Sequence, residues 1–245
     1  MGEPSFWGIA GYPVSHSLTP RLFAEVGRHL SIEGPQAVFL EAADIDEFEH
    51  HLANLDGDVW LSCTAPLKHA PQDRLGVTGP EGVNAINQLK RTRGEWTGTS
   101  TDGLGFVAAC RHIGIEPDGS VLRMRGGGSA ARSIAAAWTD AGGLLIPEQG
   151  RRALVNGPWD AAVVTDGRAA LGIDLDAAPA GGQSAPLDAD TQVSISYGDG
   201  AGTDEFAVVM VAAQHLEAWK SIFAPERAAE LPPLSLLLKR ISVTP

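Results

Sequence analysis

Apolar and polar residues in the first hundred positions follow two periodicities in turn. Short apolar runs at 5–10, 36–40 and 59–62 have the length and the flanking turn residues typical of buried strands. Between these runs, apolar side chains recur at helical spacing from 19 to 30 and again from 44 to 55. Strands that alternate with helices in this way predict a parallel sheet with helices on its faces.

Turn and cap residues mark where these elements begin and end. Thr19 and Pro20 open the first helix, so we expect the Thr19 hydroxyl to cap it and the proline to occupy the first helical position. The dipeptide Arg93-Gly94 separates strand-like runs at 83–89 and 95–97, which predicts a hairpin. The first sheet is therefore expected to be mixed and mostly parallel.

The second half of the chain continues the alternation with shorter strands. A helix at 104–113 bridges to a second domain, and Thr101 and Asp102 precede it. The pattern also predicts strands at 121–124, 144–146, 161–164 and 193–197, helices at 130–141 and 204–222, and a loop between 171 and 190. We expect an α/β fold with a three-layer N-terminal domain at 1–103 and a reduced Rossmann-type domain at 104–203, the helices of 204–245 packing back on the first domain.

The charge balance narrows the possible partners. With 18 basic and 30 acidic residues the formal net charge is -12, so no basic stripe is available to bind nucleic acid or an anionic membrane. The two cysteines give no disulfide framework, and no apolar run approaches the ~18 residues of a membrane span. These features indicate a reducing, cytoplasmic setting and leave a small anionic ligand possible.

A glycine-rich turn lies between the strand at 121–124 and the helix that follows. It has the spacing G-x-G-x-x-A, formed by Gly126, Gly127, Gly128, Ser129, Ala130 and Ala131. In this pattern the first glycine permits a tight turn, the second lets a pyrophosphate approach the backbone, and the helix N-terminus supplies amide donors. A plain strand–helix turn in an alanine-rich stretch explains these residues about as well.

A dinucleotide site also needs a residue ~20 positions further on that meets the adenosine ribose. Arg151 and Arg152 lie there, and their guanidinium groups suit a 2′-phosphate. Glu148 would instead favour an unphosphorylated ribose. A solvated basic turn is an equally good interpretation of the charges alone.

Two sets of polar residues in the first domain are candidates for chemistry. Ser17 and Thr19 are spaced so that both hydroxyls could donate to one carboxylate near a helix N-terminus. Lys68 follows a proline turn and Asp102 precedes a helix, and together they could form an acid–base pair. Taken one at a time, each of these charges is more often a surface charge than a catalyst.

Four segments in this order resemble the substrate-domain signatures of the shikimate/quinate dehydrogenase family. They are residues 11–20 (GYPVSHSLTP), 62–68 (SCTAPLK), 82–86 (GVNAI) and 100–106 (STDGLGF). The glycine turn that ends in Ala130, Ala131 and Arg132 resembles the cofactor loop of that family, and Tyr197, Met210 and Gln214 resemble its closing motifs. The resemblance extends from residue 6 to about residue 220.

The resemblance implies a role for each matching residue. The catalytic acid–base pair would be Lys68 and Asp102. The residues that bind a shikimate-like carboxylate would be Ser17 and Thr19 for the carboxylate with Tyr197 nearby, and Thr64, Asn84 and Gln214 for the ring hydroxyls. The cofactor, NADP with NAD not excluded, would be held by Gly126, Gly127, Gly128, Ser129, Ala130, Arg151 and Arg152.

The nucleotide-binding half departs from the family pattern. The stretch 149–160 is too short for the helix and strand that usually follow, and residues 164–167 replace the loop that covers the nicotinamide. The leading hypothesis is an NADP-dependent oxidoreductase that interconverts 3-dehydroshikimate and shikimate or a close cyclohexene carboxylate, as a monomer or homodimer. The alternatives are a cofactor-independent binding or regulatory protein for a polyol carboxylate, and a dehydrogenase for a different ring substituent.

Overall fold

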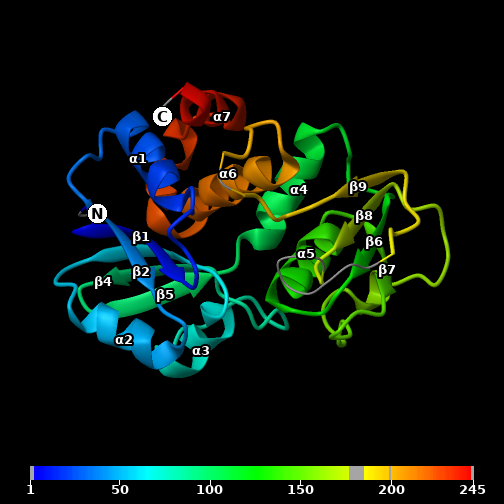
Figure 1. The fold of residues 1–245 in the computed structure, drawn as a ribbon, viewed down its shortest axis with the longest axis horizontal. Coiled ribbons are helices and arrows are strands. Elements are labelled where there is room, and N and C mark those ends of the chain that lie inside the picture. Colours follow the sequence, from blue (N-terminus) through cyan, green and yellow to red (C-terminus); the bar gives the residue numbers. More distant parts are fainter. Residues whose placement is uncertain (1–2, 177–184, 199, 244–245) are drawn as a thin grey trace. The chain divides into compact units, whose positions relative to one another are not determined.

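The computed structural model describes residues 3–176, 185–198 and 200–243. The chain forms two compact units, one of residues 1–80, 84–101 and 215–245 and the other of residues 81–83 and 102–214. Residues 81–83, 102–103 and 204–214 thus belong to the second unit, whereas the sequence analysis placed them with the first. Parallel sheets with flanking helices confirm the expected α/β class in both units (Figure 1).

The first unit is built on a five-stranded sheet in the order β2-β1-β3-β4-β5. Strands β1 (Phe6–Gly11), β2 (Gln36–Glu41) and β3 (Val59–Cys63) are parallel, and β4 (Gln88–Thr92) and β5 (Glu95–Thr99) form the antiparallel hairpin. Arg93 and Gly94, both with positive φ, make the two-residue turn that joins β4 to β5. The predicted hairpin is confirmed, although its first strand begins at Gln88 rather than at residue 83.

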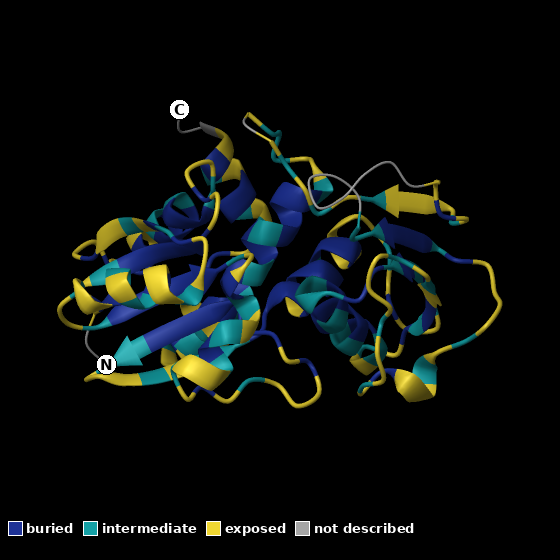
Figure 2. Cartoon of the chain, turned by 60° about the horizontal axis from the view of Figure 1, so that its bottom comes forward, coloured by how far each residue is buried: buried dark blue, intermediate teal, exposed yellow. Residues whose placement is uncertain are grey.

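Helices cover both faces of this first sheet. One face packs on α2 (Ile45–Ala53) through a buried cluster that includes Phe48, Leu61 and Ile86. The other face carries Trp7 and Trp60, which contact rings of α1 (Thr19–His29) and of a π-helical turn, Trp219–Phe223. The unit's remaining helices are the 3-10 turn Leu67–His69, α3 (Ala70–Arg74), the 3-10 turn Pro225–Glu230 and α7 (Leu234–Val243). The inner strands are the buried centre of this three-layer unit (Figure 2).

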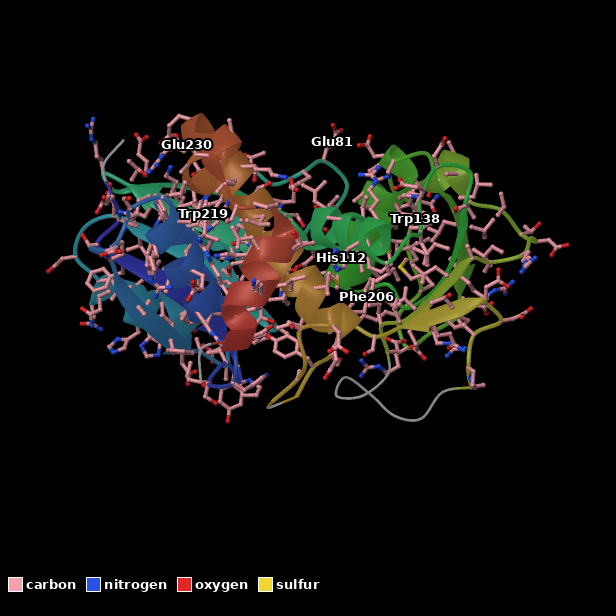
Figure 3. All side chains as sticks on the ribbon, turned by 90° about the horizontal axis from the view of Figure 1, so that it is seen from above. Glu81, His112, Trp138, Phe206, Trp219 and Glu230 are labelled. Atoms are coloured by element: carbon pink, nitrogen blue, oxygen red, sulfur yellow. The ribbon has the colours of Figure 1, made fainter. Side chains whose placement is uncertain are left out.

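The second unit contains four parallel strands in the order β7-β6-β8-β9. They are β6 (Val121–Arg125), β7 (Leu144–Glu148), β8 (Leu171–Asp174) and β9 (Thr191–Val193). Its helices are α4 (Asp102–His112), α5 (Ser129–Asp140), the 3-10 turn Asp160–Ala162 and most of α6 (Phe206–Ala218), which ends in the first unit. Phe106 of α4 packs edge-on against Trp138 of α5 and Phe206 of α6, the last two labelled in Figure 3.

Three sequence expectations in the second unit are wrong. The expected strand at 161–164 is a 3-10 turn, and only Val163 reaches the sheet, through a single bridge to Leu145. The expected loop at 171–190 instead contains β8, because Leu171 and Ile173 bury themselves beside β6; residues 177–184 lie outside the described part. The expected strand at 193–197 is replaced by β9, which ends at Val193.

Candidate active site

The loops that follow β1 and β3 are joined to one another at the carboxyl edge of the first sheet. The backbone N–H of Thr64 donates to Ala10 O at 2.9 Å, and that of Tyr12 donates to Ala65 O at 3.0 Å. Gly11 has a φ of +143°, and a Cβ at this position would lie 2.8 Å from Ala65 O. Glycine is therefore required where the two loops meet, and the Ser17 loop and the Thr64–Lys68 loop come from neighbouring strand ends.

Ser17 and Thr19 lie at the start of α1, as the sequence predicts, but their local roles differ from the expectation. Helix α1 begins at Thr19 after Leu18, and no side chain caps it, so the predicted capping role of Thr19 is wrong. The Ser17 hydroxyl instead accepts the Thr19 N–H at 3.2 Å. Thr19 is buried, and both hydroxyls lie next to the helix N-terminus, where a carboxylate is stabilised by the helix dipole.

A glutamate that the sequence pattern does not identify anchors the loop before Ser17. Glu41, the last residue of β2, accepts the backbone N–H groups of Val14 at 3.1 Å and Ser15 at 2.9 Å. These bonds tie the loop after β1 to the neighbouring strand. The 26 or 27 positions between the partners hide the pairing from any local pattern.

Lys68 lies in the 3-10 turn after β3, directly beside the segment that contains Asn84. The backbone N–H of Ile86 donates to Lys68 O at 2.6 Å. Asn84 adopts a left-handed φ of +47°, a conformation that asparagine tolerates better than most residues. Burial raises the pKa of the nearby Cys63 thiol to about 12, and the positive charge of Lys68 acts in the opposite direction. Cys63 therefore stays a thiol and is no nucleophile.

A buried network of amides and hydroxyls leads from the sheet to the first residue of α4. Thr101 donates its N–H to Asn87 Oδ1 at 2.7 Å and accepts from Gln88 Nε2 at 3.1 Å. Gln88 in turn accepts from the Ser62 hydroxyl at 2.9 Å. The network fixes the backbone immediately before Asp102, which is itself buried. The adjacent amides Asn87 and Gln88, which follow the apolar pair Ala85-Ile86 at the start of β4, are the signal that could have identified it.

The substrate candidates of the second unit lie on separate segments of that unit. Tyr197 is half-buried in the stretch after β9. Gln214 lies in α6 against Gly105 of α4, because a Cβ on Gly105 would lie 2.7 Å from the Gln214 backbone nitrogen and Cα. The close contact fixes the position of the Gln214 backbone relative to α4.

The glycine turn after β6 fits a phosphate group at the start of α5. Gly128 precedes the helix in an extended conformation, and a Cβ there would meet nothing within 4 Å. Arg132 donates from Nη1 to Gly127 O at 3.2 Å and from Nε to Val83 O at 2.7 Å. Burial lowers the pKa of Arg132, and the charge of Arg152 lowers it further, so two cations lie near this helix end. An open glycine, amide donors and two guanidinium groups suit a pyrophosphate.

The charged residues expected near the adenosine ribose have partners within the second unit. Glu148 accepts from Arg123 Nη1 at 2.6 Å. Arg151 donates its backbone N–H to the carboxylate of Asp176 at 2.5 Å, and its Nε lies 3.8 Å from the same carboxylate. Asp176 was not anticipated from the sequence.

Residues 164–167, which the resemblance assigns to the nicotinamide side, follow the bridge from Val163 to Leu145 of β7 and not a strand that pairs with β6. Strand β6 pairs with β7 on one side and with β8 on the other, so the carboxyl end of β8 also flanks the glycine turn. Asp174 ends β8 and pairs with Arg125 at 2.6 Å, whereas the carboxylate of Asp176 lies against the turn after β7 and accepts the Arg151 N–H. In an open parallel sheet, ligands bind at the point where successive strands leave the central strand on opposite sides, here between β6 and β8.

Among the described residues, no group of three or more His, Cys, Asp and Glu side chains could hold a metal ion. In the same part of the chain, no helix has both the length and the apolar character needed to cross a membrane.

Crystal structures of proteins named shikimate dehydrogenase have the same two-unit α/β fold. The crystal structure of shikimate 5-dehydrogenase from Thermus thermophilus, in complex with NADP(H) and shikimate, matches with a TM-score of 0.70 and 22% identity over 95% of this chain and 97% of that one. No protein-family model matches the chain.

Curated shikimate dehydrogenases confirm the resemblance in sequence. The NADP(+) enzyme of Xylella fastidiosa strain M12 is 34% identical over 144 residues, which are 56% of this chain and 50% of the relative. That of Acidiphilium cryptum strain JF-5 is 34% identical over 176 residues, or 65% of this chain and 62% of the relative. The chain thus spans about half the length of the curated relatives that it matches first.

Proposed function

We propose that the chain is an NADP-dependent oxidoreductase that interconverts 3-dehydroshikimate and shikimate, or a close cyclohexene carboxylate. The observation that carries the proposal is the meeting of three substrate motifs at one edge of the first sheet. The Ser17 loop is bonded to the Thr64 loop through Tyr12 and Ala65, and Lys68 is bonded to the Asn84 segment through Ile86. Curated relatives that are 34% identical over the matched segments are named shikimate dehydrogenase (NADP(+)).

In this proposal the substrate carboxylate is bound at the start of α1. The Ser17 and Thr19 hydroxyls donate to it, and the positive end of the helix dipole adds a favourable charge. Tyr197 is assigned to the same carboxylate on the strength of the family resemblance. The same resemblance assigns Thr64, Asn84 and Gln214 to the ring hydroxyls, and each of these side chains can donate and accept a hydrogen bond.

Lys68 is the proposed proton carrier. When the substrate ketone is reduced, negative charge develops on its oxygen, and the ammonium at Lys68 Nζ stabilises this charge and donates the proton. In the reverse direction the same nitrogen accepts the hydroxyl proton. Asp102 is the carboxylate assigned to Lys68 as its acid–base partner, and the Asn87–Thr101 bond holds its backbone in place. The nicotinamide cofactor supplies or accepts the hydride.

The phosphates of the cofactor are assigned to the start of α5. Gly128 leaves room for an anion, and the backbone N–H groups of the first helical turn donate hydrogen bonds to it. Arg132 and Arg152 supply positive charge. The chain has an acidic net charge, but these two arginines supply local positive charge where the cofactor is proposed to bind.

The test is the absorbance of reduced nicotinamide during turnover of shikimate with NADP or NAD, for the full chain and for Lys68→Ala. We expect turnover that falls by at least about 10²-fold in Lys68→Ala. Lys239→Ala, which removes an exposed lysine of α7, is the matched control and should keep the parent rate. Shikimate binding by calorimetry without turnover would refute the enzyme and favour a binding protein for a polyol carboxylate.

A further inference from the structure

The carboxylate of Asp176 fills the space between the two backbone turns that follow β6 and β7. A Cβ on Gly126 would lie 3.3 Å from Asp176 Oδ1, and a Cβ on Gly150 would collide with Oδ2. Asp176 Oδ2 accepts the Arg151 N–H at 2.5 Å, and the Asp176 side chain is only 14% exposed. The two glycines thus make room for a mostly buried negative charge, which is held in place by the turn that carries Arg151.

This space is where a dinucleotide fold distinguishes the two cofactors. The adenosine ribose lies beside the turn after the second strand, where an acidic group binds a ribose hydroxyl and an arginine accommodates a 2′-phosphate. Arg151 is in the right turn for the second role, but its Nε lies 3.8 Å from Asp176 Oδ1. A carboxylate this close offsets the positive charge of Arg151, which a 2′-phosphate would need, and it also repels the phosphate itself.

Among the charged residues near this turn, Asp176 is the one whose charge affects the choice between NAD and NADP. Glu148, the acidic alternative, is bonded to Arg123 at 2.6 Å. The charge of Arg152 lowers the pKa of Arg132 at the start of α5. The pyrophosphate, which NAD and NADP have in common, is assigned to this helix end. Asp176 therefore influences the part of the site in which NAD and NADP differ.

We propose that Asp176 is a specificity-determining residue, which lowers the preference for NADP over NAD by neutralising Arg151. The proposal rests on the proposed function for the presence of a dinucleotide, and it assigns a determinant that lies at the end of β8 instead of in the turn after β7.

The experiment measures dissociation constants of NADP and of NAD by calorimetry, without shikimate, so that binding is separated from turnover. The variants are Asp176→Asn, Arg151→Gln and the double variant. We expect Asp176→Asn to tighten NADP by about tenfold or more and to change NAD by less than about threefold, the size of one charged hydrogen bond gained. Asp190→Asn is the matched control, because it removes the same charge from the exposed pair with Arg168 and should leave both constants unchanged.

The arginine variants test the coupling, and Arg151 is exposed enough that its replacement should fold. Arg151→Gln alone should weaken NADP by less than about threefold, whereas in the Asp176→Asn background it should cancel the gain. A tenfold loss in Arg151→Gln alone, or an unchanged ratio of NADP to NAD affinity in Asp176→Asn, would overturn the proposal. The absence of dinucleotide binding in both the parent and Asp176→Asn would overturn it as well. Loss of turnover with binding intact would refute only the proposed function.

Discussion

Buried His215 should make the first unit acid-sensitive at pH values well above those that protonate carboxylates. Its Nε2 accepts the indole N–H of Trp219 at 3.2 Å, and the Phe23 ring meets it edge-on with centroids 4.3 Å apart. Phe223 lies on a further side at 6.5 Å. Burial among these rings lowers the pKa of His215 to about 3. The native state therefore holds His215 neutral, whereas the unfolded chain binds a proton near its ordinary value.

The sign and size of the effect follow from linkage. The folded pKa is lowered, so between about pH 6.5 and pH 3 the unfolded state binds more protons and stability falls as the pH falls. Above the unfolded value of about 6.5 the contribution to stability is fully present. A pH of 5 lies about 1.5 units below the pKa of the unfolded state. Protonation of His215 in the unfolded chain therefore lowers the free energy of unfolding by about 2 kcal/mol.

The assay is urea unfolding at about pH 7.5 and pH 5, followed by tryptophan fluorescence, for the parent chain, His215→Gln and His112→Gln. Glutamine at 215 keeps an acceptor for Trp219 and removes the titration, so this variant should lose about 2 kcal/mol less stability between the two pH values than the parent. His112 is exposed on α4, and its replacement should keep the parent pH dependence. Equal losses in the parent and His215→Gln would refute the argument.

Three further substitutions test the proposed site. Ser17→Ala should raise KM for shikimate about tenfold with kcat little changed, because one hydrogen bond to a charged group is lost; steady-state kinetics would contradict this if kcat alone fell. Thr101→Val removes the acceptor of Gln88 Nε2, so we expect a loss of about 1–3 kcal/mol in urea unfolding and a lower kcat; an unchanged kcat would remove the network from the positioning of α4. Gly105→Ala should cost about 1–3 kcal/mol and raise KM, because a Cβ there displaces the Gln214 backbone, whereas Gly198→Ala, in open space, should do neither.

The parallel strands and the hairpin turn of the first unit could be predicted because each has a complete local signal. Residues 5–10, 36–40 and 59–62 are apolar runs bounded by turns, and Arg93-Gly94 is a two-residue hairpin loop. The second unit misled the same reasoning where the signals are short. Strand β8 has four residues, one of them glycine, in a stretch rich in Ala, Gly, Pro and Asp. The more apolar Val163-Val164 was chosen as a strand, yet it makes one bridge only.

The site divides in a similar way between motifs and their supports. Motif residues such as Ser17 and Lys68 stand in recognisable segments, so the sequence alone selects them. Their supports form contacts with residues far away in the chain: Glu41 with Val14, and Asp176 with Arg151, 25 positions apart. No local pattern contains such a pair, because it arises only when parallel strands bring their carboxyl ends together.

The central strand of the second sheet shows how the shortened half is held together. A strand inside a doubly wound sheet is normally apolar on both faces, because helices cover both. Strand β6 instead alternates, with Leu122 and Met124 fully buried and Arg123 and Arg125 on the other face. Each arginine binds a carboxylate of a neighbouring strand at 2.6 Å, one on β7 and one on β8.

These ion pairs take the place of apolar packing on the face that carries the arginines. A partly buried pair is favourable only while both partners remain, so the ends of β7 and β8 are fixed by charge matching across β6. Asp176 is tied to the same region, since its backbone nitrogen donates to Asp174 Oδ1 at 3.0 Å. The pair that stabilises the short sheet therefore also positions the carboxylate that we propose to tune the cofactor site. A substitution of Arg125 should accordingly alter both stability and dinucleotide preference, whereas a substitution of Arg123 should alter stability alone.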